Sequence, residues 1–391
     1  MSDTIDYDPF GPETMADPAA AHAELRARCP VHRHDGAGHP MYSVALRADV
    51  HEILTRPDLW SNERGPGVGY ASGRIGDVQH FDPPEHTARR TFLRDAFLPG
   101  SVNAMEPRLR ELATELLDQL PSHGSADLVE AFAHPLPVLS FCELMGVPTE
   151  DSPRFREWSD ALVLSMARPE HGVDARRAFD AYLHAAVAER RADPDAAPQG
   201  LLTTLSLRPF RGEPMPVDEL VVMASQLLTA GHETTTSLVS NLVFRLLERP
   251  ELWAAVRADR ALVPAAVEES LRFDPPVLGL CRTNNDPVNL GDEELAPDTK
   301  VMALFASANR DPELFEDPDS FRLDRDPLAA RRHYAFGWGI HFCLGTHLAR
   351  LTGRVAIGAL LDRFDVLNLD GTPTRIASPF LWGRRTLPVR W

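Results

Sequence analysis

One cysteine stands in a stretch rich in glycine and aromatic residues, Tyr334 to Gly345, which reads YAFGWGIHFCLG. From Leu348 onward the apolar residues recur at helical spacing, so Cys343 lies on a turn that leads into a helix. Unpaired backbone N–H groups and the helix dipole bias such a thiol toward the thiolate. Glycines let the backbone approach a large flat group without side-chain clashes. A single thiolate on such a loop suits an axial ligand of a haem iron, whereas zinc requires four ligands, or three and a water.

A second stretch that could do chemistry is the run AGHETT at 230–235. Glycine and consecutive threonines are poor helix formers, and a threonine hydroxyl can bond the carbonyl four residues earlier and bend a helix. His232 and Glu233 begin a zinc-protease motif H-E-x-x-H, but Thr236 occupies the position of the second histidine, so that motif is incomplete. The other reading is an acid–alcohol pair, Glu233 and Thr234, which can order water and relay protons.

The elements that must position these residues are mainly helices. The chain has 391 residues, of which 43% are hydrophobic and 25% charged, which is ordinary globular composition. No linker or repeat divides it, so we expect a single domain over 1–391, mainly α with small β-sheets. A strand followed by a helix is expected over 40–55. Periodicity predicts helices at 17–28, 85–97, 103–120, 127–145, 152–167, 173–191, 217–248 and 263–273.

The spacing F-G-x-G-x-H-x-C-x-G, from Phe336 to Gly345, closely resembles the haem-binding loop of the cytochrome P450 family. The run at 230–235 resembles the family's A-G-x-[DE]-T-T element, and Glu269 with Arg272 matches its E-x-x-R motif. The resemblance spans about residues 17–391, and it is to the soluble, ferredoxin-dependent bacterial type. It implies the cytochrome P450 fold, with haem b (iron protoporphyrin IX) between the long central helix and the cysteine loop.

The resemblance also implies roles for particular residues. Cys343 would be the proximal iron ligand, and Glu233 with Thr234 the catalytic pair. Glu269 and Arg272 would form a buried structural group with Arg325, although the family often has proline where Leu323 stands. The residues expected to hold haem or its propionates are His86, Arg90, Ala230, Arg282, Phe336, Gly337, His341 and Gly345.

The expected substrate pocket is apolar. It comprises Leu228, Val277, Leu278, Gly279, Phe380 and Leu381. Such a lining favours a hydrophobic organic molecule such as a terpenoid, steroid, macrolide or aromatic compound. The implied reaction inserts one oxygen atom from O2, with electrons passing from NAD(P)H through a reductase and a ferredoxin. Two alternatives are a peroxide-driven hydroxylase, whose members usually lack the acid–alcohol pair, and a non-enzymatic haem-thiolate sensor or carrier.

Charge and cysteine usage bound the partners. A net charge of −17 argues against nucleic acid as a partner. Four cysteines without paired spacing fit a reducing cytoplasm. The sequence contains no run of about 18 apolar residues, so we expect no membrane span. We expect a monomer. Two stretches free of acids carry the basic residues Arg89, Arg90, Arg94, Arg331, Arg332, Arg350 and Arg354. These are either solvated faces or a docking patch for an acidic ferredoxin.

Overall fold

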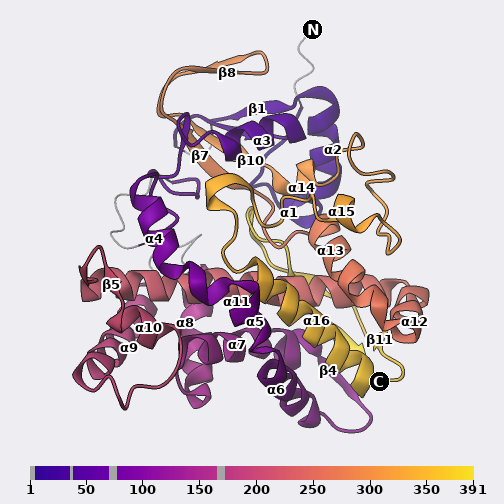
Figure 1. The fold of residues 1–391 in the computed structure, drawn as a ribbon. Helices are drawn as coiled ribbons and strands as arrows, with labels where there is room; N and C mark the ends of the chain where they lie inside the picture. Colours follow the sequence, from indigo (N-terminus) through magenta and orange to yellow (C-terminus); the bar gives the residue numbers. More distant parts are fainter. Residues whose placement is uncertain (1–4, 36–37, 70–76, 165–171) are drawn as a thin grey trace.

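A long helix, α11 (Val217–Glu248), runs through the middle of the molecule and organises the other elements. The computed structural model describes residues 5–35, 38–69, 77–164 and 172–391. Helices pack around α11, and a smaller part that contains the main sheet lies above it in Figure 1. The second helix of the centre, α16 (Thr346–Arg363), packs against α11 and follows directly on the cysteine loop.

The bounds of α11 follow from its sequence. Pro216 precedes its first residue, Asp218 and Glu219 lie in its first turn, and Arg245 lies in its last, which matches the helix dipole at both ends. Its apolar positions do not form one narrow stripe, because core side chains surround much of the helix. The predicted helix over 217–248 is confirmed to the residue.

The remaining helices are shorter. They are α1 Pro12–Ala16, α2 Pro18–Arg28, α3 Arg47–Thr55, α4 Glu85–Arg94, α5 Pro99–Asn103, α6 Glu106–Asp118, α7 Pro135–Met145, α8 Ser152–Leu164, α9 Val173–Ala192, α10 Leu201–Leu207, α12 Pro250–Ala258, α13 Val263–Phe273, α14 Phe305–Ala308 and α15 Pro327–Ala330. The predicted helix at 263–273 coincides with α13. Those at 17–28, 85–97, 103–120 and 173–191 correspond to α2, α4 with a 3-10 turn, α6 and α9.

Two helix predictions need correction. The segment 127–145 is not one helix: it contains the end of a strand, a π-helical turn (Val129–Ala133) and α7, and Pro135 begins that last helix. Proline removes a backbone donor and fits only the first turn of a helix. The helix predicted over 152–167 is α8 as far as Leu164, and residues 165–167 lie outside the described part of the chain.

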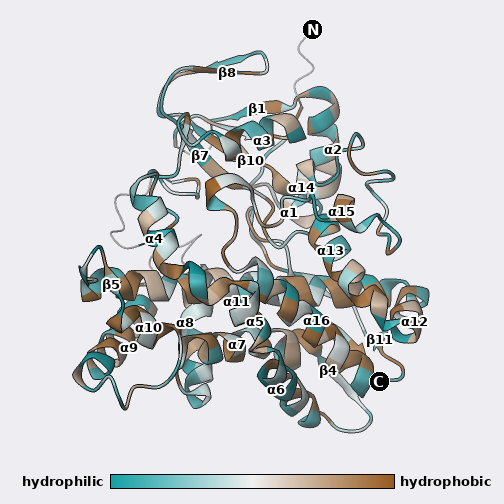
Figure 2. Ribbon diagram, viewed as in Figure 1, coloured by the Kyte–Doolittle hydropathy of each residue, from teal (hydrophilic) through white to brown (hydrophobic). Residues whose placement is uncertain are grey.

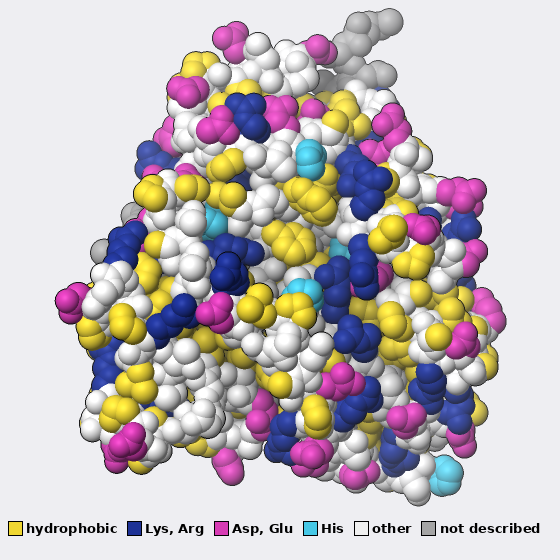
Figure 3. Space-filling view, in the orientation of Figure 1, with side chains coloured by type: hydrophobic (Ala, Val, Ile, Leu, Met, Phe, Trp, Pro, Cys, Tyr) yellow, Lys and Arg dark blue, Asp and Glu magenta, His cyan; other side chains and the backbone are white. Residues whose placement is uncertain are grey.

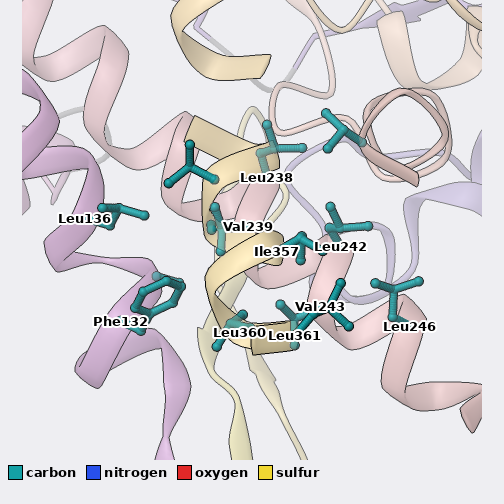
Figure 4. Packing of buried hydrophobic residues seen from close by; sticks show 14 of the residues in the cluster. Phe132, Leu136, Leu238, Val239, Leu242, Val243, Leu246, Ile357, Leu360 and Leu361 are labelled. Carbon is teal, nitrogen blue, oxygen red and sulfur yellow. The ribbon is translucent and has the colours of Figure 1, made fainter. Parts of the chain in front are cut away.

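Two large apolar clusters fill the space around α11. In one, α11 packs with α16 and the π-helical turn, and Figure 4 shows Phe132 and Leu136 approaching Val239 and Ile357 from a neighbouring segment. The other joins the N-terminal half of α11 to α7, α8, α9 and α10. Figure 2 shows hydrophobic positions along α11 and α16, and hydrophilic ones along outer elements such as the β8 hairpin. The centre of α11 is therefore held by packing from several helices.

The main sheet has five strands in the order β1-β2-β10-β7-β3, with β2 and β10 parallel and the other pairs antiparallel. Its strands are β1 Val31–His34, β2 Met41–Val44, β3 Trp60–Ser61, β7 Leu280–Asn284 and β10 Lys300–Ala303. The small sheets use β4 Ser125–Asp127, β5 Pro209–Phe210, β6 Glu213–Pro214, β8 Val288–Leu290, β9 Glu293–Leu295, β11 Asn368–Leu369, β12 Thr374–Arg375, β13 Arg384–Thr386 and β14 Pro388–Arg390. The expected strand and helix over 40–55 are β2 and α3.

No helix in the described part of the chain combines the length and the apolarity that crossing a bilayer requires.

Candidate functional site

The cysteine loop is closed by its own backbone. The N–H of Cys343 donates to the carbonyl of Phe336 at 2.9 Å, and the N–H of Gly337 donates to that of Tyr334 at 2.8 Å. A 3-10 turn, Gly339–His341, lies between these two bonds. Cys343 is partly exposed and lies three residues before the first residue of α16. The turn leading into a helix, which the sequence predicts, is therefore present.

Two glycines of the loop have left-handed backbone, with φ of 65° at Gly337 and 73° at Gly339. At Gly339 an added Cβ would lie 2.0 Å from the carbonyl oxygen of Leu54, so this glycine lets the loop rest on α3. At Gly337 an added Cβ would meet no described atom within 4 Å. Of the two glycines, only Gly337 leaves open space beside the backbone, which a flat group could occupy.

The protein alone does not favour the thiolate of Cys343. Burial raises the pKa of this thiol, and the N–H of Gly345 and the charges of Arg90 and Arg350 only partly offset that effect. The expected bias toward the thiolate is therefore wrong for the polypeptide by itself, because desolvation outweighs the helix N-terminus. A coordinated metal cation deprotonates such a thiol outright.

A cluster of nitrogen donors lies beside the loop. The rings of His86, on α4, and His341 approach to 4.2 Å between centroids. Both ring nitrogens of His86 and Nε2 of His341 are buried without a hydrogen-bond partner. Burial lowers the pKa of His86 to about 4 and that of His341 to about 2. Burial also lowers the pKa of Arg282 to about 10, which leaves this buried guanidinium positively charged at neutral pH.

Arg90 ties α4 to the cysteine loop. Its Nη2 donates to the carbonyl of Phe342, the residue before the cysteine, at 2.6 Å. Burial lowers the pKa of Arg90, and Cys343 lies close enough to oppose that effect. Phe342 also packs edge-on against Phe336 and Trp338, so the loop is braced from α4 and by its own aromatic rings.

One face of α11 opens in its middle. Ala230 and Gly231 are exposed although buried residues flank them, and Leu227 and Thr234 on the same helical face are partly exposed. The Thr234 hydroxyl donates to the carbonyl of Ala230 at 2.7 Å, as the sequence predicts for this run. Leu228, which we expected to line the substrate pocket, is instead buried in the cluster that joins α11 to α7 and α9.

Glu233 lies one residue, and about 100° around the helix, from Thr234. Burial raises the pKa of Glu233, while the neighbouring His134 opposes this and Asp160 adds to it. Among the described residues, Glu233 has no hydrogen-bond partner. This carboxyl therefore holds a proton more readily than an ordinary glutamate does.

The other predicted pocket residues lie on two facing segments. Val277 forms a bridge with Leu381, and the N–H of Leu278 donates to the carbonyl of Phe380 at 2.7 Å. Gly279 packs so tightly that an added Cβ would lie 2.5 Å from the carbonyl oxygen of Ala303. The structure thus brings Val277, Leu278, Phe380 and Leu381 together. Val277, Leu278 and Gly279 directly precede β7, which begins at Leu280.

The predicted structural group is assembled as expected. Arg272 forms a two-pronged pair with Glu269, at 2.7 and 2.8 Å, and both side chains are fully buried. Arg325 donates to the same carboxylate at 3.0 Å and to the carbonyls of Glu316, Asp317 and Ser320. Leu323, in place of proline, does not prevent this contact.

A neighbouring hydrogen-bond network around Glu268 could not be predicted from the sequence. Glu268 accepts from Arg350 at 2.5 and 2.9 Å and bonds His333 at 3.2 Å. Although burial raises its pKa, His333 and Arg350 hold the pKa of Glu268 at about 2. Only its position beside Glu269 in the motif could have drawn attention to it. This network fixes α16 to α13 just after the cysteine loop.

A family model described as Cytochrome P450 matches residues 15–387 of the chain. The chain is a cytochrome P450. It is 37% identical over 358 residues to an erythromycin C-12 hydroxylase of Saccharopolyspora erythraea, covering 89% of each protein. It is 36% identical over 363 residues to a vitamin D(3) 25-hydroxylase of Pseudonocardia autotrophica, covering 91% of this chain and 89% of the relative. Cytochrome P450 CYP109Q5 from Chondromyces apiculatus superposes with a TM-score of 0.88 at 34% identity, covering 98% and 97% of the two chains.

The predicted family, fold and enzyme class are therefore confirmed: the chain is a P450 monooxygenase, related to enzymes that oxidise small organic molecules. Membership implies haem as the cofactor. The residues of this P450 fit that group. Unpaired donors on His86 and His341, beside the buried guanidinium of Arg282 and the half-buried one of Arg90, suit its carboxylates. The open backbone at Gly337 and the exposed face of α11 suit its flat ring.

The basic residues of this P450 divide into two groups. Arg331, Arg332 and Arg94 are exposed, and Arg354 is half-buried. Arg89 is buried in pairs with Glu85 and Glu219, and Arg350 is held by Glu268, so these two are not free surface cations. In Figure 3, Lys and Arg side chains gather near the centre of the visible face, among hydrophobic and histidine side chains.

Proposed function

We propose that this P450 inserts one oxygen atom from O2 into a hydrophobic small organic molecule, with Cys343 as the thiolate ligand of haem b. The observation that carries the proposal is the unpaired, buried nitrogen cluster of His86 and His341 next to a partly exposed cysteine. Haem with a thiolate ligand supplies oxygen activation, because the thiolate favours cleavage of the O–O bond. The chain supplies binding, orientation and protons.

The haem carboxylates are held by His86, Arg90, Arg282 and His341. His86 and Arg282 are buried, and Arg90 and His341 are half-buried, so a bond to a carboxylate is stronger there than at the surface. His86 and His341 are neutral rings that can donate one N–H each, and the arginines supply the charge. The haem ring rests on backbone and apolar surface, which is provided by Ala230, Phe336, Gly337 and Gly345.

Protons are handled by Thr234 and Glu233. The hydroxyl hydrogen of Thr234 is committed to the carbonyl of Ala230, so its oxygen is left to accept a bond from water. Glu233, whose pKa is raised by burial, carries a proton that it can release to such a water. In this pair Thr234 holds water at the open face of α11, and Glu233, about 100° around the helix, supplies protons to that water. A peroxide-driven hydroxylase, or a sensor, would have no use for this pair.

The substrate is a hydrophobic molecule of the size class of steroids or macrolides. The support is the apolar group of Val277, Leu278, Phe380 and Leu381, together with the erythromycin and vitamin D(3) hydroxylases among its relatives. A panel of such compounds is expected to shift the spin state of the haem spectrum. If only small polar acids shifted it, this substrate class would be contradicted.

The electron donor is an acidic ferredoxin, reduced by NAD(P)H through its reductase. Arg331, Arg332, Arg354 and Arg94 form the proposed docking face, and their charge complements an acidic partner. We further propose that the enzyme acts as a single-domain monomer in the cytoplasm.

Replacing Cys343 with serine tests the ligand assignment. The ferrous carbonyl complex of Cys343→Ser is expected to lose the red-shifted Soret band that marks a thiolate ligand, because a serine hydroxyl cannot supply the same electron density. Cys29→Ser is the matched control, since Cys29 is also a partly exposed cysteine. Persistence of the band in Cys343→Ser would show that another residue holds the iron.

A further inference from the structure

His134, Asp160 and His232 form a compact group that the oxidation reaction does not account for. His134 lies between the π-helical turn Val129–Ala133 and α7, Asp160 lies on α8, and His232 lies on α11. One possible metal-ligating atom from each of the three residues falls within 4.8 Å of the other two. Three segments that are distant in sequence therefore converge on one point.

The bonds inside the group leave two nitrogen atoms without partners. His134 Nε2 bonds Asp160 Oδ1 at 2.9 Å, and His232 Nδ1 bonds the hydroxyl of Ser159 at 2.6 Å. The two imidazole rings meet edge to face at 4.2 Å. Nε2 of His232 is buried without a hydrogen-bond partner, in a side chain that is 1% exposed. In His134, which is 5% exposed, the unpaired nitrogen is Nδ1, on the side of the ring away from Asp160, so Nε2 is the atom that faces the site and Nδ1 can carry the ring hydrogen. Buried nitrogens of this kind are costly to leave unpaired.

The charges of the group suit a cation. Burial, reinforced by His134, lowers the pKa of His232 to about 3, so this imidazole is neutral. Burial raises the pKa of Asp160, but the bond to His134 and the nearby charges lower it overall, so the carboxylate is ionised. The charge of Arg156, the neighbouring cation, is offset by its pair with Glu130. If His232 donates its Nδ1 hydrogen to Ser159, the lone pair of Nε2 is left for a ligand.

We propose that His134, Asp160 and His232 bind a divalent transition metal ion, and that Zn2+ is the ion the ligand set fits best. Two imidazoles and one carboxylate are a common three-ligand set for zinc, with water as the fourth ligand. Zinc bonds of about 2.0–2.1 Å place two tetrahedral ligand atoms about 3.4 Å apart. The ligand atoms here lie within 4.8 Å of one another, so each pair has to approach by no more than about 1.4 Å for zinc to bind. Asp160, whose side chain is 34% exposed, provides the route from solvent.

The bound ion would connect α8 and α11 through Asp160 and His232. His232 directly precedes Glu233 in the sequence. The inference does not rest on the proposed oxidation, because the ion binds the resting, haem-loaded protein in the absence of substrate and electron donor. Zinc binding and turnover are measured separately, so either can fail alone.

The test uses the full-length, haem-loaded protein without an affinity tag, stripped by chelator and titrated with Zn2+ in a calorimeter. Asp160→Asn and His134→Gln are expected to weaken the high-affinity zinc site by more than about 100-fold, since loss of an outer-shell partner alone costs 10–100-fold. His184→Gln is the matched control, because His184 and Asp218 form an exposed His–Asp pair at 3.3 Å. This variant is expected to keep the site at unchanged affinity.

A second measurement does not depend on the folding of variants. Crystals of the wild-type protein grown with zinc are expected to give an anomalous difference peak, at the zinc absorption edge, within bonding distance of all three side chains. Equal zinc stoichiometry and affinity in wild type and both variants would overturn the proposal. So would an anomalous map with peaks only at other residues.

Discussion

At the scale of single residues, Thr234 has two bonding roles in one hydroxyl. The hydroxyl donates its hydrogen to the carbonyl of Ala230. Such a bond from a threonine to the carbonyl four residues earlier often bends the helix slightly. The hydroxyl oxygen lies on the open face of α11 beside Ala230 and Gly231. Thr229, five residues earlier on the same helix, bonds the carbonyl of Ser225 in the same way, at 3.0 Å. The bond alone therefore does not distinguish a proton-relay residue.

Thr234→Ala is expected to retain haem and substrate binding but to divert electrons to hydrogen peroxide. The fraction of consumed NADH that appears as product should fall about tenfold or more, because a positioned proton donor typically contributes at least 10²-fold. Product and peroxide formed per NADH are the measured quantities. Thr229→Ala, the matched threonine, should leave this coupling unchanged. Full coupling in Thr234→Ala would remove Thr234 from the proton path.

Some site residues are readable from sequence and others are not. Cys343 and Glu233 stand in motifs whose spacing is specific, so they could be named without coordinates. Gly339 could not be separated from Gly337, because the contact with Leu54 depends on how α3 packs against the loop. Glu268 carried no signal of its own, since its partners His333 and Arg350 lie 65 and 82 residues away.

At the scale of elements, the group around Glu269 connects α13 to the loop before α15. One carboxylate, 1% exposed, accepts from two arginines that come from segments about 50 residues apart. Arg272 also donates to the carbonyls of Asn309, Pro318 and Ser320. Taking the carboxylate away would leave two guanidinium groups without their counter-charge.

Glu269→Gln is expected to lower the free energy of unfolding by about 3–5 kcal/mol, because removing one partner leaves buried charges uncompensated. Chemical denaturation, followed by far-ultraviolet circular dichroism and by the haem Soret band, measures the loss. Asp174→Asn is the control: its pair with Arg177 is 93% and 75% exposed, and such surface pairs contribute 0–1 kcal/mol. Equal losses in the two variants would contradict a structural role for Glu269.

Long helices were easier to predict than short mixed segments. The period of α11 persists over 32 residues, so its bounds follow from pattern alone. The prediction of one helix over 127–145 was wrong because Ser125–Asp127 forms a strand that pairs with β14 at the far end of the chain. No local pattern reveals a partner that distant. The prolines at 135 and 137 were the available warning, and they mark where α7 begins.

At the scale of the whole molecule, charge is uneven. The protein has a net charge of −17, yet Arg331, Arg332 and Arg94 are exposed on a chain rich in acids. Three other arginines of the same stretches, Arg89, Arg90 and Arg350, bond groups inside the protein, which sequence alone could not reveal. A docking face must be judged from the arginines that remain at the surface.

Exchanging Arg331 and Arg332 together for glutamate is expected to slow electron transfer from a [2Fe–2S] ferredoxin by about tenfold at low ionic strength. The difference should shrink at high salt, where charges on the surface are screened. Stopped-flow reduction of the haem over a salt series measures both effects. Arg177→Glu, an exposed charge reversal on α9, is the control. Unchanged rates in the double variant would place the electron donor elsewhere.

The unpaired nitrogens of His86 and His341 have a consequence for how the protein is made. Three buried polar atoms without partners cost about 1–3 kcal/mol each until a ligand satisfies them. A ligand that binds only the folded chain adds stability by mass action. Folding and haem loading are then one coupled equilibrium, so the yield of folded enzyme in a cell depends on its haem supply. A producer strain limited in haem biosynthesis is therefore expected to yield less folded enzyme than one with ample haem.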